Sequence, residues 1–207
     1  MPNWCYTDCK VIGPEADIAR FKQACLYLEP QPQPYGRPGV NNGLDFERVI
    51  PRPDHVLRSL EANEAKCEAI DKAMNGAVAV IVPEEDKTWL DWHCENWGTK
   101  WAARDSEYYV DEHGEHILYT STAWSPPIPV YERIVAMFPT LSFVDFHIRD
   151  EMGNFFYKGT ISTAGTDIVK DEEAMREWEE AMCSATEPPA AEPISKADSS
   201  PDSAPPF

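Results

Sequence analysis

The run Trp97-Gly98-Thr99-Lys100-Trp101 is the part of the sequence whose residue types most suggest binding. Its two indole rings could stack on a ligand, and the Lys100 ammonium could pair with an anion or a carboxylate. A small-molecule binder or an enzyme could use a pocket lined by Trp97, Lys100, Trp101 and Trp124. We favour the alternative that the tryptophans pack this segment onto a sheet while Gly98 makes the turn, because large aromatic side chains usually lie in cores and interfaces.

Five neighbouring polar side chains form the best candidate for a metal site: Asp111, Glu112, His113, Glu115 and His116. We place them at the tip of a β-hairpin, where their side chains would point in different directions. A transition-metal site needs a preset geometry of ligands. We therefore interpret them as solvated turn residues, and we predict no metal and no cofactor.

The remaining nucleophiles and bases lack the arrangement that catalysis requires. His93 and Cys94 could form a thiol–imidazole pair, but adjacent positions on a helix do not face each other. Ser125 has no nucleophile-elbow motif around it, and we expect it to cap a helix. Asp145 and His147 should be exposed on one face of a strand. The opposite face of that strand would carry Val144, Phe146 and Ile148. The sequence has no phosphate-binding loop, dinucleotide fingerprint or zinc-type cysteine pairs, so we predict no catalytic residue and a protein that is not an enzyme.

Acidic side chains outnumber basic ones two to one: 36 Asp and Glu residues against 18 Lys and Arg residues give a formal charge of -18. This charge argues against direct nucleic-acid binding, which requires clustered basic residues. Our candidates for an acidic binding surface are Glu84, Glu85, Asp86, Asp171, Glu172, Glu173, Glu177, Glu179 and Glu180. Such a surface could imitate nucleic-acid phosphates and occupy the basic groove of a host protein. By charge alone, a solvated helix face that keeps the protein soluble is the favoured interpretation.

Hydrophobic periodicity and turn residues predict the elements that would position these side chains. Strands are predicted at 3–12, 107–111, 116–123, 141–148 and 154–161. Helices are predicted at 14–28, 54–75, 84–97, 125–137 and 171–183. Without residues 30–105 the order is strand, helix, strand, strand, helix, strand, followed by one extra strand and a helix. We therefore predict an α+β fold with a ferredoxin-like βαββαβ antiparallel sheet.

We predict a single domain over residues 1–183, with 30–105 as a large insertion of loops and helices between the first helix and the second strand. Residues 184–207 are predicted to be a disordered, proline-rich acidic tail. Cys5 and Cys9 should be about 13 Å apart on one strand, too far for a disulfide, and should point into a core. The chain has no signal-peptide pattern and no apolar run of roughly 20 residues, so we expect a cytoplasmic protein without a membrane span.

Three stretches follow one another along the chain: Met1-Pro2-Asn3-Trp4-Cys5, Cys94-Glu95-Asn96-Trp97-Gly98-Thr99-Lys100-Trp101, and Thr122-Ala123-Trp124-Ser125-Pro126-Pro127-Ile128-Pro129 with Phe138-Pro139. Over most of residues 1–161 the chain resembles the YubB-type ferredoxin-like domain family, encoded largely on plasmids and phages. The resemblance implies a fold and a mobile-element origin but no chemistry. Our leading hypothesis is a non-enzymatic phage or plasmid protein that binds a host protein through acidic surface and counters host defence or regulation.

Overall fold

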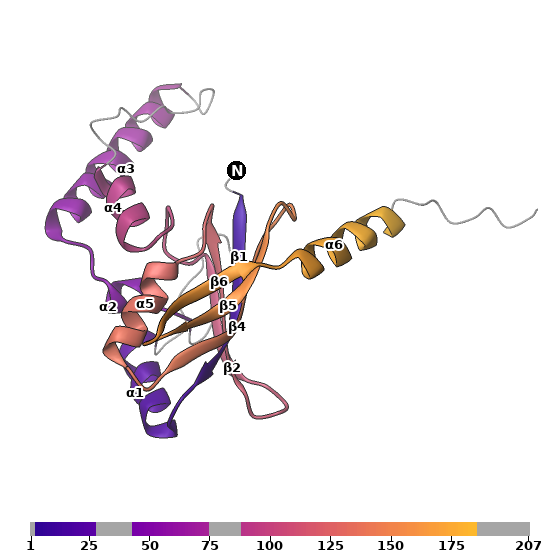
Figure 1. Ribbon diagram of the computed structural model, residues 1–207. Coiled ribbons are helices and arrows are strands. Elements are labelled where there is room, and N and C mark those ends of the chain that lie inside the picture. The colour runs from indigo at the N-terminus through magenta and orange to yellow at the C-terminus, as the bar shows by residue number, and fades with distance from the viewer. Residues whose placement is uncertain (1–2, 28–42, 75–87, 186–207) are drawn as a thin grey trace, which may run out of the picture.

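A computed structural model describes residues 3–27, 43–74 and 88–185, which form a mixed α+β fold with a six-stranded antiparallel sheet and six helices (Figure 1). The strands are β1 (Trp4–Ile12), β2 (Asp105–Val110), β3 (His116–Ala123), β4 (Ser142–Asp150), β5 (Phe156–Ser162) and β6 (Gly165–Lys170). The helices are α1 (Glu15–Cys25), α2 (Phe46–Val49), α3 (Asp54–Met74), α4 (Thr88–Asn96), α5 (Ile128–Met137) and α6 (Glu172–Ala185). No helix within the described ranges is long and apolar enough to cross a membrane.

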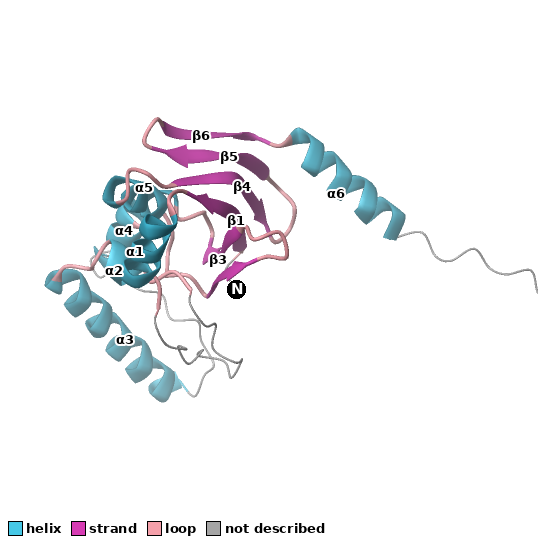
Figure 2. Cartoon of the chain, turned by 90° about the horizontal axis from the view of Figure 1, so that it is seen from below, coloured by secondary structure: helices cyan, strands magenta, loops and turns pink. Residues whose placement is uncertain are grey.

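Strand β1 lies inside the sheet and joins its two halves. The strand order is β2-β3-β1-β4-β5-β6, and every neighbouring pair is antiparallel. Helices α1, α2, α4 and α5 gather on one face of the sheet, whereas α6 extends away from it (Figure 2). Among the described residues, helices therefore cover one face of the sheet and leave the other face open.

The covered face holds the hydrophobic core. Alternating residues of β1 are buried there: Cys5, Thr7, Cys9 and Val11. This confirms that Cys5 and Cys9 point into the core, where both are free thiols. Burial raises the pKa of the Cys5 thiol to about 12. From α5, the Tyr131 ring packs edge-on against Phe143 and Phe146, with ring centres 4.9 and 4.8 Å apart, a favourable aromatic geometry.

All five predicted strands and all five predicted helices are present, with shifted ends. Parts of the predicted insertion and almost all of the predicted tail lie outside the described residues, as do the ends of some predicted helices: residues 28, 30–42, 75–87 and 186–207. Two elements escaped prediction. Helix α2 has only four residues, begins after the capping side chain of Asp45, and lies in the predicted insertion between the helices predicted at 14–28 and 54–75. Strand β6 is a sheet edge with no buried residue, so it has no alternating hydrophobic pattern that could reveal it.

The predicted face assignment of β4 is partly wrong because the strand contains an irregularity. Its pairing with β5 shifts register between Phe143 and Phe146, and Asp145 has a φ of +46°. Phe143 and Phe146 are both buried, although they are three residues apart. Val144 pairs with Lys10 and is only half-buried, so it does not share the buried face of Phe146. A β-bulge adds one residue and changes the alternation in this way.

Candidate functional site

Gly98 ends α4 and starts the loop that carries the predicted binding residues. Its φ of +76° lies in the left-handed region, which glycine adopts without steric cost. A Cβ atom at this position would lie 2.7 Å from Pro129 Cδ and 3.1 Å from the Pro126 carbonyl oxygen. The prediction that Gly98 makes the turn is therefore confirmed, and the loop packs directly on the start of α5.

Two hydroxyl groups tie this loop to the end of β3. The buried Thr99 hydroxyl donates to the Ala123 carbonyl over 2.7 Å. The Ser125 hydroxyl donates to the Gly98 carbonyl over 2.5 Å. The prediction that Ser125 caps α5 is wrong, because the cap position is Pro127 and no side chain bonds to the helix start there. Ser125 holds the loop instead.

His93 connects α4 to the same loop from inside the protein. Its Nδ1 lies 2.8 Å from the Lys100 carbonyl oxygen, so the neutral ring carries its proton on Nδ1 and donates it. The ring is 2% exposed, and burial lowers the pKa of His93. Within the described part of the chain, neither His93 Nε2 nor the buried Trp89 Nε1 has a hydrogen-bond partner. His93 is therefore a buried, neutral structural residue.

Trp97 lies in the core, with 1% of its surface exposed. Its Nε1–H donates to the Ile50 carbonyl over 2.9 Å. Its ring stacks on His93 with centres 4.3 Å apart and meets Phe46 edge-on at 5.6 Å. The Arg52 guanidinium lies 5.2 Å from the ring centre. Trp97 thus joins α2 and α4 to the core, which agrees with the packing interpretation of this residue.

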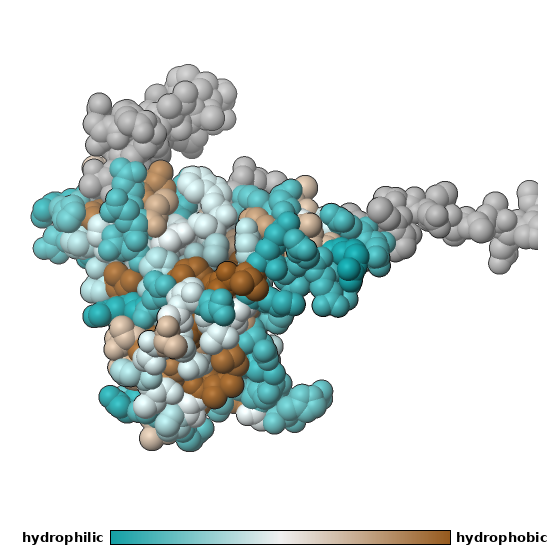
Figure 3. Space-filling view, viewed as in Figure 1, coloured by the Kyte–Doolittle hydropathy of each residue, from teal (hydrophilic) through white to brown (hydrophobic). Residues whose placement is uncertain are grey.

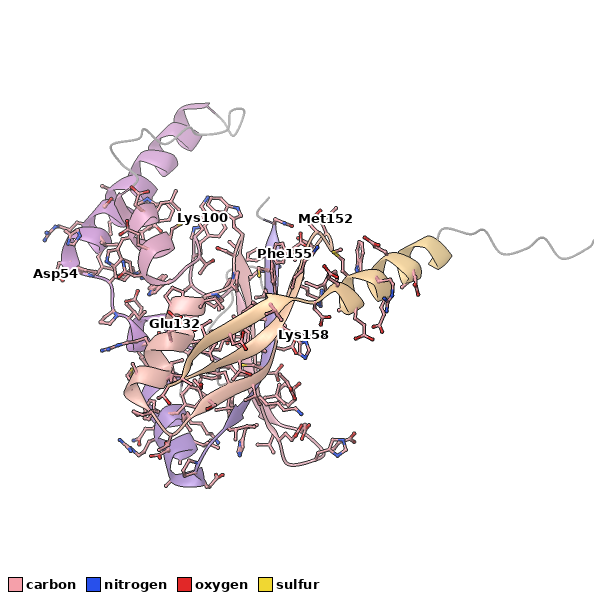
Figure 4. All side chains as sticks on the ribbon, viewed as in Figure 1. Asp54, Lys100, Glu132, Met152, Phe155 and Lys158 are labelled. Atoms are coloured by element: carbon pink, nitrogen blue, oxygen red, sulfur yellow. The ribbon has the colours of Figure 1, made fainter. Side chains whose placement is uncertain are left out.

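Trp101, Lys100 and Trp124 meet at the surface and are called the Trp–Lys–Trp clamp below. Lys100 Nζ lies 4.5 Å from the ring centre of each tryptophan. Trp101 is 39% exposed and Trp124 is 47% exposed. Figure 4 shows Lys100 at the end of the sheet where β1 begins. The structure therefore brings together three of the four predicted pocket residues and places Trp97 in the core.

Two further features distinguish the clamp. Among the described residues, no carboxylate forms an ion pair with Lys100, although the chain carries twice as many acidic as basic residues. Trp124 has a φ of +75°, which is unusual for a bulky residue, and its backbone N–H donates to the Asn3 carbonyl over 2.8 Å. Backbone strain of this kind persists only where the surrounding structure holds it.

The predicted acidic surface divides into three parts. Glu84, Glu85 and Asp86 lie outside the described residues. Asp171 is 6% exposed; its carboxylate accepts from the Ala174 N–H over 3.2 Å and pairs with Lys158 over 3.1 Å. The remaining predicted acids are exposed on α6: Glu172, Glu173, Glu177, Glu179 and Glu180. Asp171 thus anchors the helix, while the other five carboxylates form its hydrophilic surface (Figure 3).

The polar residues of the β2–β3 turn point in different directions. The Asp111 carboxylate accepts from the backbone N–H groups of Glu115 and His113 over 2.8 and 2.9 Å, and these bonds lower the pKa of Asp111. His116 turns toward Tyr108 and Glu15 instead. No cluster of three or more potential ligands occurs among the described residues. These side chains order the turn and the adjacent strand ends.

The open sheet face carries arginine–aromatic pairs that the sequence prediction missed. The Arg149 guanidinium lies 4.5 Å from the Tyr6 ring centre, and Arg104 lies 4.6 Å from that of Trp4. Tyr6 also stacks with Tyr119 at 6.5 Å. The alternation in β1 was a usable signal, because burying Cys5 and Cys9 places Trp4 and Tyr6 on the other face.

Comparison with known proteins does not establish a family for this chain. No protein-family model matches it, and no curated protein matches it. Among solved structures, it is similar to protein api92 from Yersinia pseudotuberculosis, of the family DUF1281. The TM-score is 0.45 and the identity 8%, over 83% of this chain and 98% of that chain. A similarity of this size carries no argument about function.

Proposed function

We propose that this chain is a non-enzymatic phage or plasmid protein that binds a host protein with a basic surface through α6, and thereby counters host defence or regulation. The observation that carries the proposal is the set of five exposed carboxylates on a helix that extends away from the sheet (Figure 1). Carboxylates on such a helix can pair with the lysines and arginines that normally bind phosphates. The sequence resemblance motivates the phage or plasmid origin.

The first turns of α6 are attached to the sheet, which fixes the direction in which the acids point. Asp171 pairs with Lys158 of β5 at the start of the helix. Two turns further on, the Trp178 ring lies 6.2 Å from the Phe156 ring. A Cβ on Gly153 would come within 2.6 Å of the same indole. The anchored side leaves the acidic side free for a partner.

Three of these acids follow the spacing of one helix face. Glu173, Glu177 and Glu180 stand four and three residues apart, and side chains at this spacing are neighbours on a helix. All three are exposed, and Arg176 approaches Glu180 only to 3.9 Å. This row is the part of the surface that a basic groove would contact.

The ferredoxin-like arrangement that we propose for the core has its own support. Strands β2-β3-β1-β4 are adjacent in that order, with α1 following β1 and α5 between β3 and β4. This is the order that a split βαβ pair produces. Strands β5 and β6 then extend the sheet toward α6, which explains why the acidic helix stands beyond the covered face.

Affinity capture from a host lysate tests the proposal when the row is neutralised by Glu173→Gln, Glu177→Gln and Glu180→Gln. A matched control with the same charge change carries Glu61→Gln, Glu64→Gln and Glu95→Gln at exposed positions outside α6. We expect a protein partner that is lost at high salt and lost in the α6 variant, but retained by the control. The absence of a salt-sensitive partner, or an equal loss in both variants, contradicts the proposal.

A further inference from the structure

We propose that the Trp–Lys–Trp clamp binds a nucleotide, with the base between the indoles of Trp101 and Trp124 and the phosphate on Lys100. This site is independent of α6 and of any protein partner. Two exposed aromatic rings around one ammonium group match a ligand that combines a planar ring with a negative charge. A nucleotide is the common biological ligand with both features on one molecule.

The distances within the clamp admit no more than one base. Both ring centres lie 4.5 Å from the same Lys100 Nζ atom, so they are at most 9.0 Å apart, twice that distance. A planar ring stacked on both sides needs about 3.5–4 Å to each neighbour, or roughly 7–8 Å in all. The ammonium group therefore occupies the space that a base would take, and it must move outward when the base enters.

Lys100 is suited to that movement. Its four-carbon side chain is flexible, and its ammonium group has no carboxylate partner among the described residues that would hold it in place. The cation–π contacts that it gives up are weak at exposed sites. In return it can form a charge-assisted hydrogen bond to the phosphate. The backbone does not have to move, because only the side chain changes position.

The backbone around the clamp is held in place before any ligand arrives. The buried Thr99 hydroxyl fixes the residue preceding Lys100 to Ala123, the residue preceding Trp124. The carbonyl of Lys100 is held by His93, while its side chain remains at the surface. Trp124 keeps a left-handed backbone conformation that costs energy. Such preorganisation lowers the entropy lost on binding.

Charge favours a free nucleotide over a nucleic-acid strand as the source of the base. The chain carries a formal charge of -18, so a long polyanion is repelled at low salt, whereas a mononucleotide brings only one phosphate. Base stacking on aromatic side chains does not require a particular sequence. Adenosine monophosphate (AMP) and guanosine monophosphate are therefore the first ligands to test, and an oligodeoxyadenylate serves as the strand.

Nuclear magnetic resonance of the seven tryptophan indole N–H groups tests the proposal on the full chain. We expect AMP to shift the signals of Trp101 and Trp124 saturably and to leave that of the buried Trp97 in place. Trp101→Ala should weaken binding about 10- to 100-fold, the usual effect of removing one stacking ring. Lys100→Gln should weaken AMP binding about tenfold but leave adenosine binding unchanged, because only AMP carries the phosphate.

Tyr109→Ala removes an equally exposed aromatic side chain from β2 and should leave AMP binding unchanged. The indole signals of the core tryptophans report whether each variant is folded. The proposal is overturned if AMP up to about 10 mM shifts neither clamp signal, where even weak ligands register. It is also overturned if Lys100→Gln weakens AMP and adenosine equally. Tighter binding of the oligonucleotide than of AMP would retain the base-binding clamp but assign the base to a strand.

Discussion

Trp97 and Trp101 stand four residues apart in one motif, yet they belong to different parts of the molecule. Trp97 is 1% exposed and donates a hydrogen bond to Ile50, whereas Trp101 is 39% exposed under the Lys100 ammonium. On a continuous helix this spacing would put both rings on one face. Gly98 ends α4 between them, so the chain turns outward. The end of the helix, and not the residue type, decides which tryptophan is core and which is surface.

Replacing each of the two tryptophans in turn is the most severe test of this comparison. Trp97→Ala should lower the free energy of unfolding by about 3–5 kcal/mol, because it leaves a large cavity and an unpaired Ile50 carbonyl. Trp101→Ala should lower it by only about 1–2 kcal/mol, since Trp101 is 39% exposed and loses less buried apolar surface. Urea denaturation measures both values. Similar losses would show that Trp101 is a core residue after all.

The contrast also shows what the sequence could predict. The regular elements followed from periodicity, because a buried stripe or an alternating strand leaves a pattern in the sequence. Predicting that Trp97 is buried and Trp101 is exposed would require the end of α4 to be known to within one residue. Periodicity does not define a helix end that closely. The bulge at Asp145 was also unpredictable, because it depends on how β4 pairs with β1, which is distant in the sequence, as well as with β5.

The turn that separates the two tryptophans can be altered directly. Gly98→Ala should lower the free energy of unfolding by about 2–3 kcal/mol, because the new Cβ meets Pro129 and the backbone is left-handed. Gly114→Ala is the matched control: its φ is +80°, but no atom lies within 4 Å of the added Cβ. We expect a loss of about 1–2 kcal/mol there, from the backbone alone. Equal losses in chemical denaturation would argue against close packing at Gly98.

The pH dependence of stability tests the buried surroundings of Trp97, where His93 stacks on its ring. Burial, together with the nearby Arg52 charge, lowers the pKa of His93 below its ordinary value of 6.5 against the smaller opposing effects of the Lys100 carbonyl and Glu47. The unfolded state therefore binds the proton first as the pH falls. His93 thus stabilises the fold above about pH 6.5, and this contribution is lost progressively below that pH.

Thermal unfolding between about pH 7.5 and 5 measures this effect. We expect the wild-type melting temperature to fall on the acidic side and His93→Gln to flatten that part of the curve. His113→Gln changes an exposed histidine of the β2–β3 turn and should leave the slope unchanged. If the advantage of the wild type over His93→Gln does not shrink toward pH 5, the neutral, buried state of His93 is contradicted.

The two candidate sites were predictable to different degrees, because the α6 surface depends on local composition and the clamp depends on contacts between distant segments. The exposed acids of α6 could be predicted from composition, because a run of charged residues on a helix has to remain in water. The clamp could be predicted only as a set of residue types. Its geometry depends on hydrogen bonds from Thr99 to Ala123 and from Ser125 to Gly98, which connect segments more than 20 residues apart. No local pattern encodes such contacts.

The smallest expected effect concerns the backbone of the exposed clamp. At Trp124, with a φ of +75°, both Gly and Ala remove the indole, but only Ala retains the strain of about 1–2 kcal/mol. Glycine adds about 0.5–1 kcal/mol of unfolded-state entropy. Trp124→Gly should therefore be as stable as Trp124→Ala, or more stable by up to about 1.5 kcal/mol. At Tyr109, an exposed position in a regular strand, the order should reverse, because no strain is relieved there. Urea denaturation measures both orders. If alanine is the more stable replacement at both positions, the surroundings do not fix the left-handed conformation at Trp124. The clamp would then lack the preorganisation that distinguishes it from an ordinary pair of surface tryptophans.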